Sequence, residues 1–147
     1  MNRRFGSPVL DAACRLFLPF ILLFAVYVVV HGHDSPGGGF QGGAIAASAV
    51  ILIRMVRGDN PPWFLDSRRA LICACSGVGL FVADGFLDLL FGGNYLDYGA
   101  LPLPLKATKV RFFGSFIVEV GVGIGVVGTL VLIYDALTHG NGLDEGE

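Results

Sequence analysis

The sequence predicts an all-α membrane protein with four transmembrane helices and a short glycine-rich loop between the first and the second. Three observations predict this fold. Of the 147 residues, 54% are hydrophobic and only 15% are charged, whereas a soluble domain of this size needs a more strongly charged surface. The apolar residues are concentrated in four runs, each close to the roughly 20 residues that a helix needs to span a membrane. Prolines and glycines punctuate the connections between these runs.

We expect residues 1–147 to form a single four-helix transmembrane subunit. Its predicted spans cover residues 10–30, 40–56, 70–91 and 112–137. Pairs of prolines interrupt the two longer connections, 57–69 and 92–111, which are therefore predicted to be irregular. Four spans place both termini on one side of the membrane together with the 57–69 connection. Because that side carries more arginine and lysine than the other, the positive-inside rule predicts cytoplasmic termini.

Composition also argues against several functional classes. The formal net charge of −2 disfavours a nucleic-acid partner, which would need a basic face. The three cysteines cannot form a fully paired disulfide framework, and Cys73 and Cys75 point roughly 200° apart on a helix, which disfavours joint metal ligation. The cysteine sets that hold iron–sulfur clusters are also missing. We therefore expect no redox or hydrolytic site, no cofactor and no metal in this chain, and do not expect it to be an enzyme.

Acidic residues inside the predicted spans are the leading candidates for a functional site, because a charge within the membrane costs several kcal/mol unless it is paired. Glu119 lies about 10 Å into the fourth span, at 1.5 Å per residue, and has no cationic neighbour on the same helix. Asp84 lies about two turns before the end of the third span. Asp88, one turn further on, is expected to reach the interface and to be solvated.

Topology places these acids in the same half of the membrane as the loop after the first span, which contains His31, His33 and Asp34. Carboxylates and imidazoles gathered in one place can relay protons or bind a cation. We therefore predict that Glu119, Asp84 and the three loop residues line an ion or proton path. The alternative is that each intramembrane carboxylate pairs with an arginine or lysine of another subunit and only fixes packing. A metal site in the loop is not expected, because no further ligand completes the set.

The fourth span contains "GIGVVG", residues 123–128, which matches the glycine pattern of dinucleotide-binding proteins. That pattern requires a preceding strand within a βαβ unit, for which an apolar span has no room. We therefore interpret Gly121, Gly125 and Gly128 as small residues at helical spacing that let another helix approach closely. Gly43 and the small residues after it are predicted to do the same on the second span.

Two stretches resemble a known family. "GHDSPGGGFQGG", residues 32–43, resembles the signature of the B-type subunit of Mrp multisubunit sodium/proton antiporters. "IVEVGVGIGVVG", residues 117–128, resembles the last span of that subunit, in which an acidic residue precedes Gly-Val. The number of spans also agrees, so the resemblance covers nearly the whole chain. One departure is that the family pattern has Asn where this chain has Asp34.

The resemblance implies a small, non-catalytic subunit of a cation (Na+)/proton antiporter. It implies a multi-pass protein in the cell membrane (inner or plasma) of a prokaryote, surrounded by the lipid bilayer. The implied partners are the other membrane subunits of the complex, including large antiporter-like subunits. The same module also occurs in membrane-bound hydrogenase-type complexes, in which electron transfer drives ion pumping, so a redox-driven pump is the alternative parent. A third possibility is a pure assembly scaffold.

The glycine-rich loop is expected to have a structural role. Pro36 fixes the backbone where the loop begins, and Gly37, Gly38 and Gly39 permit backbone angles that are closed to other residues. Because they carry no side chains, they also let a neighbouring backbone pack against the start of the second span at Phe40. We predict a rigid turn docked against partner subunits beside the ion path, with a mobile gate as the alternative.

Overall fold

The computed structural model describes residues 7–32, 37–57, 66–98 and 106–139. These residues form four helices, which are α1 (Pro8–Val30), α2 (Gly39–Arg57), α3 (Ser67–Leu90) and α4 (Ala107–His139). All four are long and apolar enough to cross a membrane, which confirms the predicted all-α fold with four transmembrane helices.

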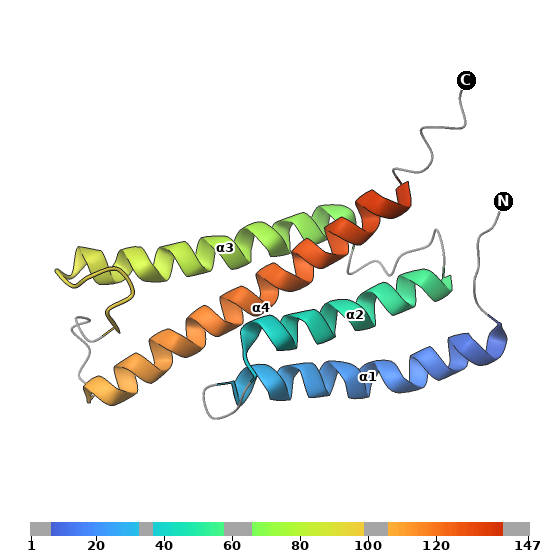
Figure 1. Cartoon of the computed structure of the whole chain (residues 1–147), viewed down its shortest axis with the longest axis horizontal. Coiled ribbons are helices and arrows are strands. Elements are labelled where there is room, and N and C mark those ends of the chain that lie inside the picture. Colours follow the sequence, from blue (N-terminus) through green and yellow to red (C-terminus); the bar gives the residue numbers. More distant parts are fainter. Residues whose placement is uncertain (1–6, 33–36, 58–65, 99–105, 140–147) are drawn as a thin grey trace, which may run out of the picture.

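The helices lie side by side in an open layer, in the order α3, α4, α2 and α1 (Figure 1). The central helix α4 packs against α3 on one side and α2 on the other, and α1 packs mainly against α2. The start of α1 lies at the same end of the layer as the end of α4. The end of α1 and the start of α2 lie toward the opposite end, where α3 and α4 extend beyond them. The end of α1 and the two acids near the end of α3 are therefore in the same half of the layer.

Each helix begins earlier than the apolar run that predicted it. In α1 and α3 a polar residue caps the extended first turn, and the first turn of α4 is free of helix breakers. Ser7 caps α1, and its hydroxyl oxygen accepts a hydrogen bond of 3.2 Å from the backbone N–H of Leu10. Asp66 caps α3, and its Oδ1 accepts a hydrogen bond of 2.9 Å from the backbone N–H of Ser67. The prediction that residues 92–111 are irregular is wrong for 107–111, which form the first turn of α4. That stretch contains no proline or glycine, and the two prolines that motivated the prediction precede it.

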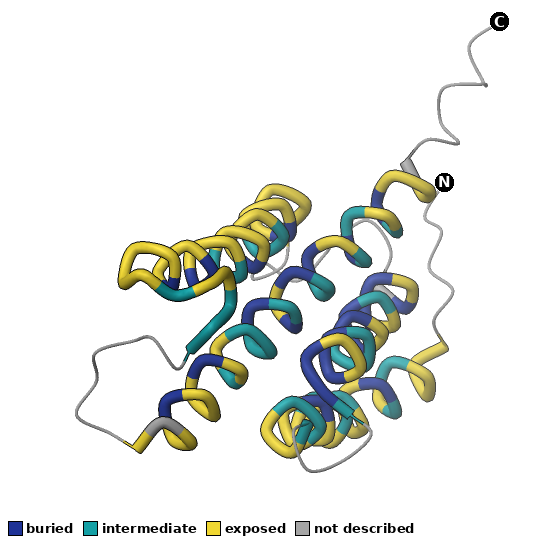
Figure 2. The backbone as a smooth tube through the Cα atoms, turned by 60° about the vertical axis from the view of Figure 1, so that its left-hand side comes forward, coloured by how far each residue is buried: buried dark blue, intermediate teal, exposed yellow. Residues whose placement is uncertain are grey.

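Burial differs strongly between the helices (Figure 2). Half of the α2 span is buried within the chain, compared with 11% of the α1 span. Large apolar side chains such as Phe17, Phe20 and Leu90 are exposed on the outer faces of α1 and α3. In a membrane, these faces meet lipid or neighbouring subunits rather than water.

Glycines set the close spacing between α4 and both of its neighbours. A Cβ placed on Gly77 of α3 would collide with the backbone at Gly121 and Gly125 of α4. On the other side, a Cβ on Gly43 of α2 would lie 2.7 Å from the carbonyl oxygen of Gly123. The predicted role of these small residues in close helix packing is therefore observed, and the helices that they admit belong to the same chain.

Candidate functional site

The turn between α1 and α2 closes around the side chain of Glu119, which comes from α4. A Cβ on Gly32 would lie 2.5 Å from the Cα of Gly38, so the two arms of the turn touch. The same Cβ would lie 2.9 Å and 3.0 Å from the two carboxylate oxygens of Glu119, and a Cβ on Gly38 would lie 3.2 Å from Oε1. The carboxylate therefore occupies the space that side chains at these two positions would need.

The backbone of Glu119 is held as closely as its side chain. A Cβ on Gly39 would overlap the carbonyl group of Glu119, so the start of α2 tolerates only glycine at this contact. Gly38 has a φ of 152°, which side chains of L-residues rarely allow. The neighbouring backbone that packs against these glycines is thus that of α4 in the same chain. Docking of the turn against partner subunits stays a prediction.

Among the described residues, the Glu119 carboxylate has no cationic partner. Its Oε2 is buried and accepts no hydrogen bond from the residues that the structure describes. Neither of the ion pairs found among those residues, Arg15–Asp11 and Arg54–Asp135, involves it. A carboxylate in such surroundings retains a proton, binds a cation, or meets a cationic group of another subunit. The role of Glu119 in an ion or proton path stays a prediction.

Of the predicted histidines and aspartate of the loop, His31 is the one that lies among the described residues. The ring of His31 stacks on Tyr27, with 4.1 Å between centroids, and its Nδ1 lies 3.2 Å from the carbonyl oxygen of Tyr27. His31 thus interacts with its own helix. His33, Asp34 and Pro36 lie outside the described residues, and their roles stay predictions.

A pair of carboxylates, Asp84 and Asp88, lies on the other side of α4, toward the end of α3. The exposed fraction is 8% for Asp84 and 0% for Asp88. The expectation that Asp88 is solvated is therefore wrong. The physical reason is that residues 91–98 fold back over the end of α3, where the N–H of Gly93 donates a hydrogen bond of 3.1 Å to the carbonyl oxygen of Asp88. A hydropathy pattern does not reveal this return.

Tyr98, in the returning segment, interacts with the buried pair. Its hydroxyl lies within hydrogen-bonding reach of the Asp84 carboxylate. Burial, together with the negative charges of Asp84 and Asp88, raises the pKa of Tyr98 to about 12. The hydroxyl therefore keeps its proton at physiological pH and acts as a donor.

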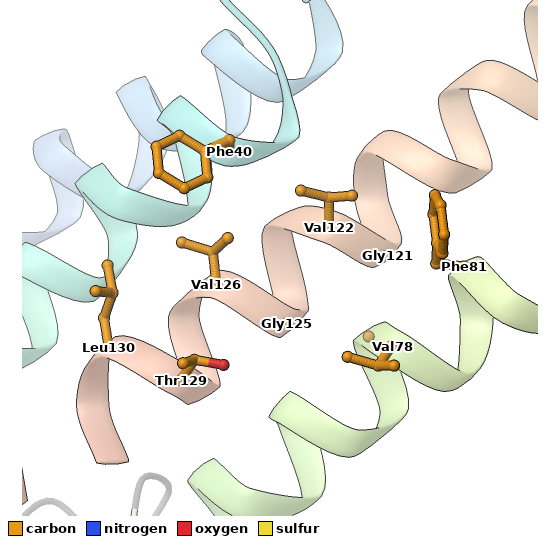
Figure 3. A pocket seen from close by; sticks show the side chains of 10 residues that line it. Phe40, Val78, Phe81, Gly121, Val122, Gly125, Val126, Thr129 and Leu130 are labelled. Atoms are coloured by element: carbon orange, nitrogen blue, oxygen red, sulfur yellow. The ribbon is translucent and has the colours of Figure 1, made fainter. Parts of the chain in front are cut away.

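A groove of about 400 Å³ lies between α2 and α3, with α4 as its floor (Figure 3). Phe40 lines it from α2 and Phe81 from α3, while Gly121 and Gly125 lie along the floor. Of its ten lining residues, only Thr129 has a polar side chain. This lining does not offer the ligands that an ion needs, so the carboxylates, and not the groove, are the candidate ion-binding groups.

One buried polar cluster has no counterpart among the sequence predictions. Arg54 of α2 donates a hydrogen bond from Nη1 to Oδ1 of Asp135 in α4, and Ser67 at the start of α3 donates to Oδ2 of Asp135 at 2.6 Å. The exposed fraction is 6% for Arg54 and 8% for Asp135. In the sequence, Arg54 lies near the end of the second predicted span, 40–56, and Asp135 near the end of the fourth, 112–137. A signal was nevertheless present, because the topology puts the ends of the second and fourth spans on one side.

Residues 9–132 match the family described as "Domain related to MnhB subunit of Na+/H+ antiporter". The chain belongs to this family. The matched range contains the glycine-rich turn, Glu119, Asp84 and Asp88. The resemblance to the B-type subunit is therefore confirmed.

Individual relatives of this MnhB-family chain agree with that assignment. The B-type Na(+)/H(+) antiporter subunit of Bacillus subtilis is 30% identical over 131 residues, covering 88% of this chain and 91% of that protein. The protein of the same name from Alkalihalophilus pseudofirmus is 28% identical over 140 residues, covering 88% and 95%. A Rhizobium meliloti protein, named as a probable K(+)/H(+) antiporter chain of combined A and B type, is 29% identical over 131 residues, covering 85% of this chain and 13% of that protein.

Proposed function

We propose that the chain is the B-type membrane subunit of a multisubunit cation/proton antiporter, and that Glu119 carries part of its ion or proton path. Membership of the MnhB family supports the first part. The enclosed Glu119 carboxylate, which has a buried oxygen without a described hydrogen-bond donor, carries the second. In this proposal the chain acts by completing the membrane complex rather than through a redox or hydrolytic site of its own.

The names of the relatives support particular partners. One relative is named for the A and B types together in a single chain, which supports an A-type subunit of the complex as a direct neighbour of this one. The relatives are named for sodium in some cases and potassium in another, so the choice of cation belongs to the complex. The excess of arginine and lysine on one side supports cytoplasmic termini in the cell membrane.

The geometry supports a specific role for the turn. Gly32 and Gly38 bring backbone, and no side chain, against the Glu119 carboxylate. Such a wall excludes bulky groups but leaves the carboxylate free to exchange a proton for a cation. Because a single carboxylate cannot be neutralised by both at once, the two ligands would compete for the same site. This competition is the property that an antiporter requires.

Purification of the native complex in mild detergent tests which parent complex contains the chain. We expect the subunit masses to include antiporter-like subunits, and a metal assay to find no nickel or iron, because the relatives are named as antiporter subunits. Co-purification of nickel, iron or iron–sulfur proteins would instead place this chain in a redox-driven pump.

Replacement of Glu119 with Gln tests the ion path. The amide keeps the size of the side chain and so its fit between Gly32 and Gly38, but it can neither release a proton nor neutralise a cation. We expect cation/proton exchange in everted membrane vesicles to fall to the level of vesicles without the complex, while assembly is unchanged. The matched control is Ser115→Ala at an exposed position one turn earlier on α4. Exchange at the wild-type rate, or loss of assembly, would favour a purely structural Glu119.

A further inference from the structure

Asp84 and Asp88 form a buried carboxylate pair that is separate from the Glu119 site. They lie one turn apart on the same face of α3. Oδ2 of Asp84 and both carboxylate oxygens of Asp88 are buried and accept no hydrogen bond from the described residues. Burying a hydrogen-bond acceptor without a partner costs free energy, and burying two adjacent negative charges costs more. The pair therefore needs a ligand.

The surroundings of the pair supply one donor and additional negative charge. Tyr98 reaches Asp84 with its hydroxyl, and Asp97 lies close enough to Asp88 to act on it electrostatically. In the described part of the chain, no arginine or lysine forms an ion pair with either acid. On α4, which packs against α3, Lys109 and Arg111 are exposed. The 99–105 stretch, which lies outside the described residues, contains no charged residue at all.

Two aromatic rings from the returning segment cover the pair. Tyr95 occupies a hollow at Gly85 of α3, where a Cβ would strike its ring, and packs edge-on against Phe86 with 6.2 Å between centroids. Tyr98 fills a similar hollow at Gly114 of α4. The glycines thus allow the rings to sit deep at the α3–α4 contact. This cover explains why Asp88 is not exposed at all.

We propose that Asp84 and Asp88 form a second proton-binding site, in which the two carboxyl groups share one proton. The shared proton converts one carboxyl group into a hydrogen-bond donor to the other and removes half of the buried charge. Tyr98 then donates to the remaining carboxylate. A divalent ion would need about six oxygen ligands, and the described residues contain no cluster of three or more metal-ligating side chains. The role of this proton in transport rests on the proposed antiporter function, but its presence does not.

Infrared spectroscopy of the assembled complex tests this site directly. With carbon-13 at the side-chain carboxyl of aspartate, the protonated carboxyl band of aspartate is separated from that of glutamate. We expect the wild type to show an aspartate band at neutral pH that is lost in the Asp84→Asn/Asp88→Asn double variant. Each single variant should lose its band at a pH lower by about one unit or more, because the repulsion between two carboxylates is gone. An unchanged band in the double variant, or unchanged titration in both single variants, would overturn the proposal.

Three further measurements keep the test specific. Tyr98→Phe keeps the ring in the Gly114 hollow but removes the donor, so the band should persist to higher pH, and an unchanged titration would count against the site. Addition of sodium or potassium at fixed pH should leave the band in place, and its loss would identify a cation site instead. Glu119→Gln should leave the aspartate band unchanged even where exchange is abolished. The proposed role of Glu119 and the proposed proton site at the aspartates can therefore be contradicted independently, the first by exchange activity and the second by the infrared band.

Discussion

Replacement of Arg54 with Met is expected to lower the stability of the protein by about 3–5 kcal/mol, because it removes the cationic member of the buried Arg54–Asp135 ion pair. Ser67 would still donate one hydrogen bond to Asp135, but a hydroxyl cannot neutralise the charge. The ends of α2 and α4 would then separate or admit water. The measurement is the fraction of assembled complex that survives heating in detergent, followed by size-exclusion chromatography.

The chain offers a matched control for this prediction. Arg15 forms an ion pair with Asp11 one turn away on α1, but at an exposed position, with 2.8 Å between Nη2 and Oδ2. Arg15→Met is expected to cost less than about 1 kcal/mol, since exposed pairs contribute little. Adding Asp135→Met to Arg54→Met should recover most of the lost stability, because an apolar pair can replace a buried ion pair. Equal stability of the two single arginine variants would show that the Arg54 pair is not buried in the complex.

Replacement of Gly39 with Ala is expected to prevent the α1–α2 turn from closing on α4. The added methyl group would overlap the carbonyl of Glu119, and a helical backbone cannot rotate away from it. We expect a large loss of assembled complex from the membrane, measured by affinity purification and subunit stoichiometry. Gly38→Ala should act in the same direction, because its positive φ strains any other residue.

Gly79→Ala is the control for the glycine prediction, because nothing lies within 4 Å of the added Cβ. Alanine is also favoured over glycine inside a helix by about 1 kcal/mol, so this variant should assemble at least as well as the wild type. A Gly39→Ala complex that assembles normally but does not exchange ions would contradict the rigid turn. It would make the turn a mobile gate.

Hydropathy predicted the four helices well because a helix that crosses a membrane must be apolar over about 20 residues. It was least accurate at the helix starts, where capping by Ser7 and Asp66 or the absence of helix breakers extends a helix into polar sequence. For this reason the range predicted to be irregular, 92–111, continued five residues too far into α4. The prolines in the connection were informative about where a helix stops, but not about where the next one begins.

Topology predicted which groups share one half of the membrane, but not which of them touch. Glu119 and the glycine-rich turn were placed at the same level, and the structure brings them into contact. Asp84 was placed at that level too, yet it lies on the other side of α4, at α3. The lateral order of helices depends on the shapes of their faces, which the pattern of apolar residues does not specify. Asp135 was missed because its partner, Arg54, is distant in the sequence.

The central position of α4 has a consequence for how the protein is made. The helix that holds the layer together is the last of the four to leave the ribosome, so α3 enters the membrane without its main neighbour. Until α4 is inserted, the hollows at Gly77 of α3 and Gly43 of α2 lack the α4 backbone that fills them. Folding of the whole chain is thus decided at the end of translation. A chain truncated before α4 would present a hairpin and a lone helix to the proteases that remove orphaned membrane segments.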